Sequence, residues 1–167
     1  TATFEEDLSR VESEPNDYYS NADALELDES IFGQLGNSSD ADWYKVSIGG
    51  AGTLTFDLSL RGNTFGKWKV DVYRDGMVWY GGAVWSASDK YQMALGESGN
   101  YGLKVYSSSS THSDAVYSLT PSFELGLSGV ETEPNNDHQN ADQMNFGEEI
   151  DGELGYSGDK DWYKISV

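Results

Sequence analysis

The sequence predicts an all-β protein, an antiparallel β-sandwich of jelly-roll type followed by an incomplete second copy of the same domain. Two observations predict the sandwich: short stretches of alternating apolar and polar residues recur along the chain, and turn-forming residues separate them. The third observation, an internal repeat, predicts the second copy. No segment keeps the 3.6-residue apolar period of an amphipathic helix, so we expect little helix.

The repeat sets the domain organisation. Residues 12–48 and 131–167 align without a gap at an offset of 119 residues, and 19 of the 37 aligned pairs are identical. This period is far longer than that of solenoid or propeller repeats, which indicates duplication of a whole domain. The expected parts are a leader segment (1–11), a complete sandwich (12–125), a linker (126–130) and a truncated second copy (131–167). Since Thr1 is no initiator methionine and no signal peptide precedes it, we expect an excised piece of a larger, processed protein.

Each strand of the complete domain has its own signal. The segment GTLTFDLSL at 52–60 alternates apolar and polar residues with period two. A glycine-rich turn divides 90–107 into two expected strands, and 115–123 is expected to be the last strand. A short turn at 20–25 is the one candidate for helix.

The segment 67–82 predicts a hairpin, because Asp75-Gly76 favours a two-residue type I′ turn. That turn pairs Arg74 with Met77, Tyr73 with Val78, Val72 with Trp79 and Asp71 with Tyr80. The face expected in the core then holds Trp68, Val70, Val72 and Trp79, and the opposite face holds Tyr73, Val78 and Tyr80. On the strand NYGLKVY at 100–106 we expect Tyr101, Leu103 and Val105 inside, with Lys104 and Tyr106 outside.

Two further aromatic positions are constrained less tightly. Trp43 and Tyr44 are neighbours on an expected strand and must face opposite ways, and we expect Trp43 to be the core residue. Trp85 has no assigned face. An outward set of Tyr73, Tyr80 and Tyr106 would form a flat aromatic patch suited to a polymer, although ordinary cross-strand pairing explains exposed tyrosines almost as well.

Composition excludes several classes of function. The formal charge of −19 argues against binding to nucleic acid or to anionic membrane surfaces, because phosphates would be repelled. It suits a secreted protein or one whose carboxylates bind cations. The absence of cysteine excludes disulfides, thiolate zinc sites and a cysteine nucleophile. His112, Ser113 and Asp114 are adjacent in sequence, which gives no support to a catalytic triad, so we expect no enzyme in this chain.

The repeated acidic segments predict a divalent-cation site. Hard cations such as Ca²⁺ take six to eight oxygen ligands. Glu12 and Glu14 share one face of an extended segment, and Pro15 stiffens it. The candidate oxygen donors of the first copy are Glu12, Glu14, Asn16, Asp17, Asp40 and Asp42. The alternative, that these residues simply form turns in an acidic protein, does not explain why both copies keep both glutamates, the proline, the asparagine and both aspartates.

The combination of ESEPND, NADAL, DADWYKVSI, GTLTFDL and GNYGLKVYS resembles the bacterial pre-peptidase C-terminal domain family over 12–121, and again over 131–167. Members are β-sandwich modules of secreted bacterial enzymes, often proteases, and the collagen-binding domains of clostridial collagenases are similar. The resemblance implies calcium at the acidic segment. In the second copy the corresponding candidates are Glu131, Glu133, Asn135, Asn136, Asp159 and Asp161. Asn136 replaces the acid of the first copy, which should weaken that site.

The resemblance therefore implies a non-catalytic accessory module of a secreted bacterial enzyme, a peptidase foremost, that is stabilised by calcium. A second hypothesis is a targeting module that holds its parent enzyme on collagen, another insoluble protein or a polysaccharide. A third is a passive spacer or a tail that assists secretion.

The truncated second copy leaves apolar positions without sandwich partners, namely Ile150, Leu154, Trp162, Ile165 and Val167. We expect it to pack on the first domain or on another chain, with strand exchange as one route.

Overall fold

The computed structural model describes residues 10–60, 68–85, 89–107, 115–126, 129–152, 154 and 159–167. His112, with its neighbours Ser113 and Asp114, and the side chains of Trp79 and Trp85 lie outside this description. The part that the structure describes is all-β apart from one short 3₁₀ turn, η1 (Tyr19–Asn21), which overlaps the start of the turn predicted at 20–25, whereas residues 23 and 24 belong to a strand.

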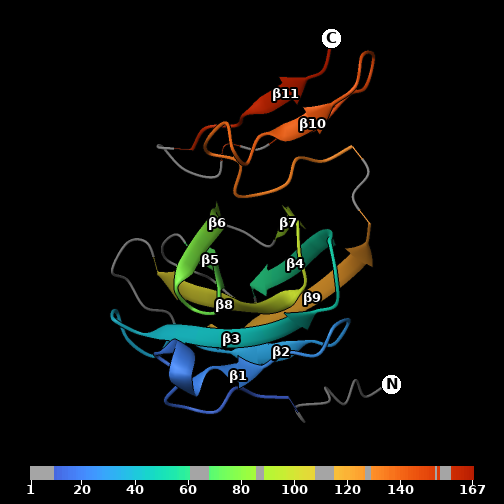
Figure 1. The fold of residues 1–167 in the computed structure, drawn as a ribbon. Coiled ribbons are helices and arrows are strands. Elements are labelled where there is room, and N and C mark those ends of the chain that lie inside the picture. Colours follow the sequence, from blue (N-terminus) through green and yellow to red (C-terminus); the bar gives the residue numbers. More distant parts are fainter. Residues whose placement is uncertain are drawn as a thin grey trace.

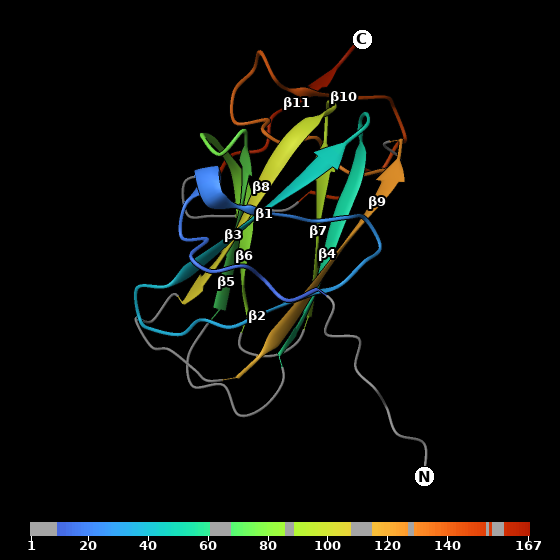
Figure 2. The same cartoon turned by 90° about the horizontal axis from the view of Figure 1, so that it is seen from below.

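Two packed sheets form a β-sandwich, as predicted (Figures 1 and 2). One sheet has the strand order β1-β3-β8-β5-β6, and its strands are β1 (Asp23–Ala24), β3 (Ala41–Ile48), β5 (Trp68–Arg74), β6 (Val78–Trp85) and β8 (Gly99–Ser107). The other has the order β2-β9-β4-β7, and its strands are β2 (Ile31–Gly33), β4 (Gly52–Leu60), β7 (Asp89–Leu95) and β9 (Tyr117–Leu125). The strand pairs are antiparallel except for β1 with β3.

The core lies between these sheets and follows the predicted alternation. On β4 the fully buried side chains are Leu54, Phe56 and Leu58, with half-buried residues between them. On β8 and β5 the buried apolar set is Tyr101, Leu103, Val105, Trp68, Val70 and Val72, as expected. Burial of such large side chains supplies most of the driving force for folding, since each is worth about 1.5–3 kcal/mol.

On β3 the prediction for Trp43 is wrong. Tyr44, Val46 and Ile48 face the core, and Tyr44 is fully buried. Trp43 lies on the opposite face, which we call the outer face of the β1-β3-β8-β5-β6 sheet. It is nevertheless only 8% exposed, because the rings of Tyr19 and Tyr73 lie against it at centroid distances of 5.8 and 5.0 Å.

The predicted turn type of the hairpin is confirmed, but the predicted pairing of its strands is wrong. Asp75 and Gly76 both have positive φ, 49° and 70°, and Met77 N–H donates to Arg74 C=O at 3.0 Å, as in a type I′ turn. The strands, however, pair Arg74 with Val78 and Tyr73 with Trp79, and the register then shifts between Val72 and Tyr73. The pairing is thus displaced by one residue from the first pair after the turn, and the irregularity then places one further residue, Tyr80, on β6.

The displaced pairing of Tyr73 with Trp79 places the next residue, Tyr80, on the core side. Its side chain is 8% exposed and packs edge to face on the buried Tyr101 at 5.6 Å. The predicted outward set of Tyr73, Tyr80 and Tyr106 is therefore not one patch. Tyr73 and Tyr106 remain on the outer face, as expected.

The C-terminal segment (residues 129–167) lies beyond the ends of β6 and β7 and contains β10 (Asp142–Met144) and β11 (Tyr163–Ile165), which pair in parallel (Figure 1). It contacts the first unit (residues 10–126) through a parallel bridge between Leu95 and Glu133. The apolar positions expected to be covered by this packing are not: Leu154, Trp162, Ile165 and Val167 are exposed, and Ile150 is partly exposed. No helix among the described residues has the length and apolar character needed to cross a bilayer.

Candidate metal centres

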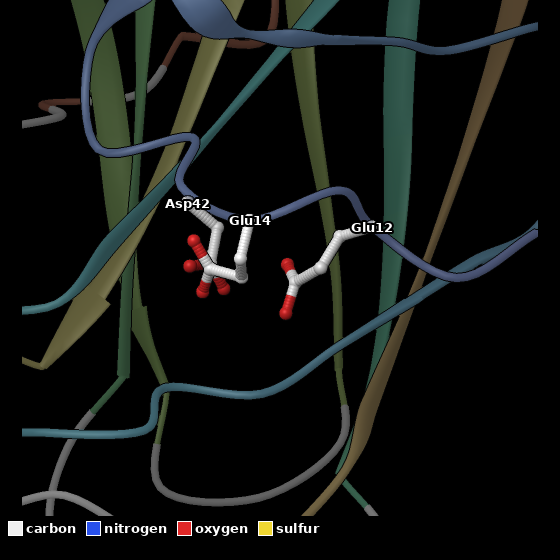
Figure 3. Close-up of side chains that lie close together, drawn as sticks. All are labelled: Glu12, Glu14 and Asp42. Atoms are coloured by element: carbon white, nitrogen blue, oxygen red, sulfur yellow. The ribbon is translucent and has the colours of Figure 1, made fainter.

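Three carboxylates of the first unit converge where the chain enters the sandwich. One oxygen each of Glu12, Glu14 and Asp42 lies within 4.8 Å of the others (Figure 3). Two of these residues come from the first acidic segment (residues 12–17) and the third from β3. We call them the first carboxylate cluster.

The fold holds Glu12 with four hydrogen bonds, of which the longest comes from the Tyr117 hydroxyl at 3.5 Å. The backbone N–H of Glu12 donates to Phe32 C=O at 2.9 Å, which fixes the first acidic segment against β2. Its carboxylate accepts from the backbone N–H of Gln34 and from the Tyr44 hydroxyl, both at 2.6 Å. Tyr44 is thus a core residue whose polar tip supports the cluster, a common arrangement for buried tyrosine.

Asp42 is fully buried, and one of its oxygens accepts a hydrogen bond from the Tyr117 hydroxyl. The two phenol oxygens of Tyr44 and Tyr117 lie 2.5 Å apart, so the tyrosines join Glu12 to Asp42 across the sandwich. Neither tyrosine was among the predicted site residues. The recurrence of Tyr44 as Tyr163 in the repeat was the available signal, whereas Tyr117 lies outside the repeated residues 12–48.

Asn16 lies at the centre of the acidic segment and is fully buried. Its backbone N–H donates to Glu14 Oε2 at 3.0 Å and its carbonyl accepts from Trp43 N–H at 3.0 Å. Its side-chain amide donates to Asp23 Oδ2 at 3.2 Å, and Asp23 also accepts from the N–H of Ser13 at 2.8 Å. Asp23 was missed from the sequence, although NAD recurs at 21–23 and 140–142.

Two buried oxygens beside the cluster have no hydrogen-bond partner among the described residues, Oδ1 of Asn16 and Oδ1 of Asp42. A buried acceptor without a partner costs about 1–3 kcal/mol. Carboxylate and amide oxygens are the donors that Ca²⁺ takes, in flexible geometry and high number. The residues present therefore fit a hard divalent cation.

The electrostatics of the cluster also favour a bound cation. Burial, followed by the charge of Glu12, raises the pKa of Asp42 from 3.8 to about 9. Burial also raises the pKa of Glu14, and the charge of Asp40 adds to this. Two like charges 4.8 Å apart repel by roughly 3.5 kcal/mol at an effective dielectric constant of about 20. The attraction of a divalent cation to each carboxylate would outweigh this repulsion.

Gly33 makes room for the cluster. A Cβ atom at this position would lie 2.5 Å from Glu12 Oε2 and 2.5 Å from the Tyr117 ring, closer than real side-chain contacts. At its counterpart in the repeat, Gly152, a Cβ would lie 2.5 Å from the Tyr163 hydroxyl and 2.9 Å from Glu131 Oε2, although Tyr163 corresponds to Tyr44 and not to Tyr117. Both glycines permit the close approach of a glutamate to a tyrosine.

The second acidic segment (residues 131–136) repeats the geometry at the same offset. One oxygen each of Glu131, Glu133 and Asp161 lies within 4.8 Å of the others, and we call them the second carboxylate cluster. Tyr163 donates to Glu131 at 2.6 Å, as Tyr44 does to Glu12. Asn135 N–H donates to Glu133 at 3.2 Å.

Further contacts recur as well. Asn135 is fully buried and its amide donates to Asp142 at 3.2 Å, matching Asn16 and Asp23. Trp162 N–H donates to Asn135 C=O at 3.2 Å. Three buried oxygens of this cluster have no hydrogen-bond partner among the described residues: Oε1 of Glu133, Oδ1 of Asn135 and Oδ1 of Asp161. Both X-Pro bonds, Glu14–Pro15 and Glu133–Pro134, are cis.

The two clusters differ in which of their carboxylates are buried. Glu131 and Glu133 are 3% and 9% exposed, whereas Glu12 is half-buried and Glu14 is exposed. Burial, followed by the charge of Asp159, raises the pKa of Glu133 to about 7. Burial and the charge of Glu131 also raise the pKa of Asp161.

The remaining predicted donors lie around these clusters rather than in them. Asp40 is buried and accepts from Gly36 N–H at 2.5 Å, and Asp17 is half-buried beside Glu14, whose pKa its charge raises. Asn136 accepts from the N–H of Lys160 at 3.1 Å, and Asp159 accepts from the same N–H at 3.0 Å. These two residues thus hold the backbone of Lys160, next to Asp161.

The outer face of the β1-β3-β8-β5-β6 sheet carries a second group of chemically active side chains. Tyr106 donates to Asp71 at 2.7 Å, and Lys69 pairs with Asp71 at 3.0 Å. Lys104 Nζ lies 4.8 Å from the ring centre of Tyr106 and 5.7 Å from that of Trp43. Aromatic rings and ammonium groups alternate on this face in an otherwise strongly acidic protein.

Comparison with known proteins places the fold. No protein-family model and no curated protein matches the chain. Among solved structures, the pre-peptidase C-terminal domain of a collagenase from Bacillus anthracis matches with a TM-score of 0.50 and 16% identity, over 60% of this chain and 93% of that domain.

Two other solved structures match with lower scores. One is PliG of Aeromonas hydrophila, a periplasmic inhibitor of g-type lysozyme, with a TM-score of 0.47 and 17% identity over 62% of this chain and 96% of that one. The other is the carbohydrate-binding module CBM36 in complex with calcium and xylotriose, with a TM-score of 0.33 and 14% identity over 60% of this chain and 93% of that one. The chain thus shares its fold with a pre-peptidase C-terminal domain, as its sequence motifs suggested.

Proposed function

We propose that this chain is a calcium-stabilised, non-catalytic accessory module of a secreted bacterial enzyme, a peptidase foremost. The observation that carries the proposal is the first carboxylate cluster, in which Glu12, Glu14 and Asp42 converge beside buried oxygens without partners. The fold shared with a domain of a collagenase supports the accessory role.

In this proposal Ca²⁺ ties the first acidic segment to β3. Glu12 and Glu14 belong to the segment, and Asp42 belongs to a strand whose neighbours fill the core. An ion held by all three would cross-link them and stabilise the folded state by mass action, because the unfolded chain has no such site. The second carboxylate cluster would take a second ion.

Thermal unfolding tests the calcium proposal. Calcium at about a hundred times its dissociation constant should add about 2.7 kcal/mol of stability, so that chelation lowers the Tm by several degrees. Magnesium at the same concentration is the control ion, because it demands octahedral geometry and keeps its waters. Superimposable melting curves in calcium, magnesium and chelator would refute the proposal.

The outer face favours a second function, attachment of the parent enzyme to an insoluble polymer. Tyr73 and Tyr106 lie on one face with Lys69 and Lys104, which offers ring surfaces and cations to a fibre or polysaccharide. Because the solved neighbour comes from a collagenase, insoluble collagen belongs in the test panel beside cellulose, chitin and xylan.

A co-sedimentation assay separates attachment from a passive spacer. The double substitution Tyr73→Ala and Tyr106→Ala should abolish retention on whichever polymer retains the wild type. Lys90→Ala is a matched surface control, since Lys90 lies on the other sheet, paired with Asp57 at 3.2 Å. Retention of the wild type on no polymer would leave the spacer role, and equal retention of the double variant would exclude the outer face.

A further inference from the structure

The second acidic segment contacts one end of β7, the edge strand of the β2-β9-β4-β7 sheet. Leu95, at the end of the edge strand β7, forms a parallel bridge with Glu133, and Glu133 N–H donates to Ala94 C=O at 3.3 Å. A Cβ atom on Gly96 would lie 2.7 Å from the methyl group of Thr132. Edge strands present unpaired N–H and C=O groups, which makes them docking sites for extended segments.

The residue that docks also belongs to the second carboxylate cluster. Glu133 pairs through its backbone with β7, and its side chain lies with Glu131 and Asp161. A pocket of about 210 Å³ lies between the two parts of the chain, lined by Tyr80 and Tyr91 on one side and by Glu133 and Asp159 on the other. The second cluster therefore lies at the junction, whereas Glu14, the counterpart of Glu133, is exposed.

Docking has an electrostatic consequence. Contact with β7 leaves Glu133 only 9% exposed, close to the carboxylates of Glu131 and Asp161, and one of its oxygens has no partner among the described residues. Asn135, fully buried beside it, donates to Glu131 at 3.0 Å and has an unpartnered carbonyl oxygen. Burial of like charges with unpartnered oxygens is unfavourable unless a cation joins them.

We infer that binding of a divalent cation to the second carboxylate cluster is linked to docking of residues 131–133 on the β7 edge, so that calcium fixes the C-terminal segment against the first unit. The inference rests on the calcium site of the proposed function and adds that this ion controls an interface within the chain. Linkage is reciprocal, so a change that removes the coupling to docking must also lower the affinity of the second cluster for the ion, by the same factor.

Hydrogen exchange read by mass spectrometry tests the forward direction. Calcium should slow exchange of the amides of residues 131–136 about tenfold or more in the wild type. Asp161→Asn, which removes a ligand without touching β7, should abolish this slowing. Asp42→Asn, the corresponding change in the first cluster, should leave it intact.

Calorimetric titration with calcium tests the reverse direction. Gly96→Val places a side chain where Thr132 packs and should weaken the second site about tenfold while leaving the first unchanged. Gly49→Val is the matched control, since nothing lies within 4 Å of a Cβ atom there.

The outcomes distinguish the two claims. Binding of two calcium ions without any change in exchange at 131–136, or unchanged affinity in Gly96→Val, would overturn the inference and leave the proposed function standing. Binding of no calcium at all would refute the proposed function itself.

Discussion

Replacing Asp42 by Asn should raise the stability of the calcium-free protein and abolish the stabilisation that calcium provides at the first carboxylate cluster. Asp42 is fully buried near Glu12 and Glu14, so its charge is unfavourable unless a cation neutralises it. Asn keeps the acceptor oxygen for the Tyr117 hydroxyl but carries no charge, and it is a poorer ligand.

The magnitude follows from the pKa of Asp42, which burial raises from 3.8 to about 9. The pKa of Asp42 is higher in the folded than in the unfolded state. Asp42 therefore does not lower the free energy of unfolding below about pH 4, and it lowers it increasingly as the pH rises toward 9. At pH 7 the interval from 3.8 is 3.2 pH units, which amounts to about 4 kcal/mol at about 1.4 kcal/mol per unit. Asp42→Asn should recover up to this amount at pH 7 and less than about 1 kcal/mol at pH 4.

The Tm of the wild type and of the variant is measured under four conditions, at pH 4 and at pH 7, each in chelator and in calcium. In chelator at pH 7 the variant should melt higher than the wild type by several degrees, and the difference should shrink at pH 4. A thousandfold excess of calcium over its Kd should add about 4 kcal/mol to the wild type and close the gap.

Asp57→Asn is the control for this series, because Asp57 is a partly exposed carboxylate paired with Lys90 at 3.2 Å on the far sheet. It should change the Tm little at either pH. If Asp42→Asn lowered the Tm in chelator at pH 7, Asp42 would act as a structural acceptor and the electrostatic reasoning would be refuted.

Three further substitutions test the surroundings. Gly33→Ala should weaken calcium binding at the first cluster tenfold or more, because its Cβ would lie 2.5 Å from Glu12 Oε2; calorimetry showing the wild-type affinity would contradict this. Trp43→Ala should lower the free energy of unfolding in urea by about 3 kcal/mol through loss of packing on Tyr19 and Tyr73; a loss under about 1 kcal/mol would mean that the outer face contributes little. Tyr117→Phe should cost about 1–3 kcal/mol in chelator by removing the donor to Asp42, and an unchanged Tm would argue against that hydrogen bond.

Strand positions were predictable because alternation of apolar and polar residues is a local property. The segment 52–60 coincides with β4, and Tyr101, Leu103 and Val105 are buried as expected. Which of two neighbours faces the core is not local. Trp43 and Tyr44 had to face opposite ways, but the positions of Tyr19 and Tyr73 on the outer face explain how the larger residue is covered outside the core.

The hairpin shows a second limit. The Asp75-Gly76 dipeptide determined the turn, but the strands pair one residue away from the expected register from Arg74–Val78 onward, and an irregularity follows between Val72 and Tyr73. One displaced residue moved Tyr80 to the opposite face and removed it from the expected aromatic patch.

The candidate metal centres were predictable in part because the repeat preserves them. The alignment identified the convergent carboxylates Glu12, Glu14 and Asp42 and their counterparts. It could not distinguish these from Asp40, which accepts from a backbone N–H nearby, nor foresee that β7 would bury Glu133. Such contacts join residues far apart in the sequence.

Titration of the wild-type chain with calcium in a calorimeter tests the central claim most directly, because it counts the ions bound. Two carboxylate clusters predict two calcium ions per chain, reduced to one in either Asp42→Asn or Asp161→Asn. Absence of heat and of bound calcium at millimolar concentrations would contradict the account.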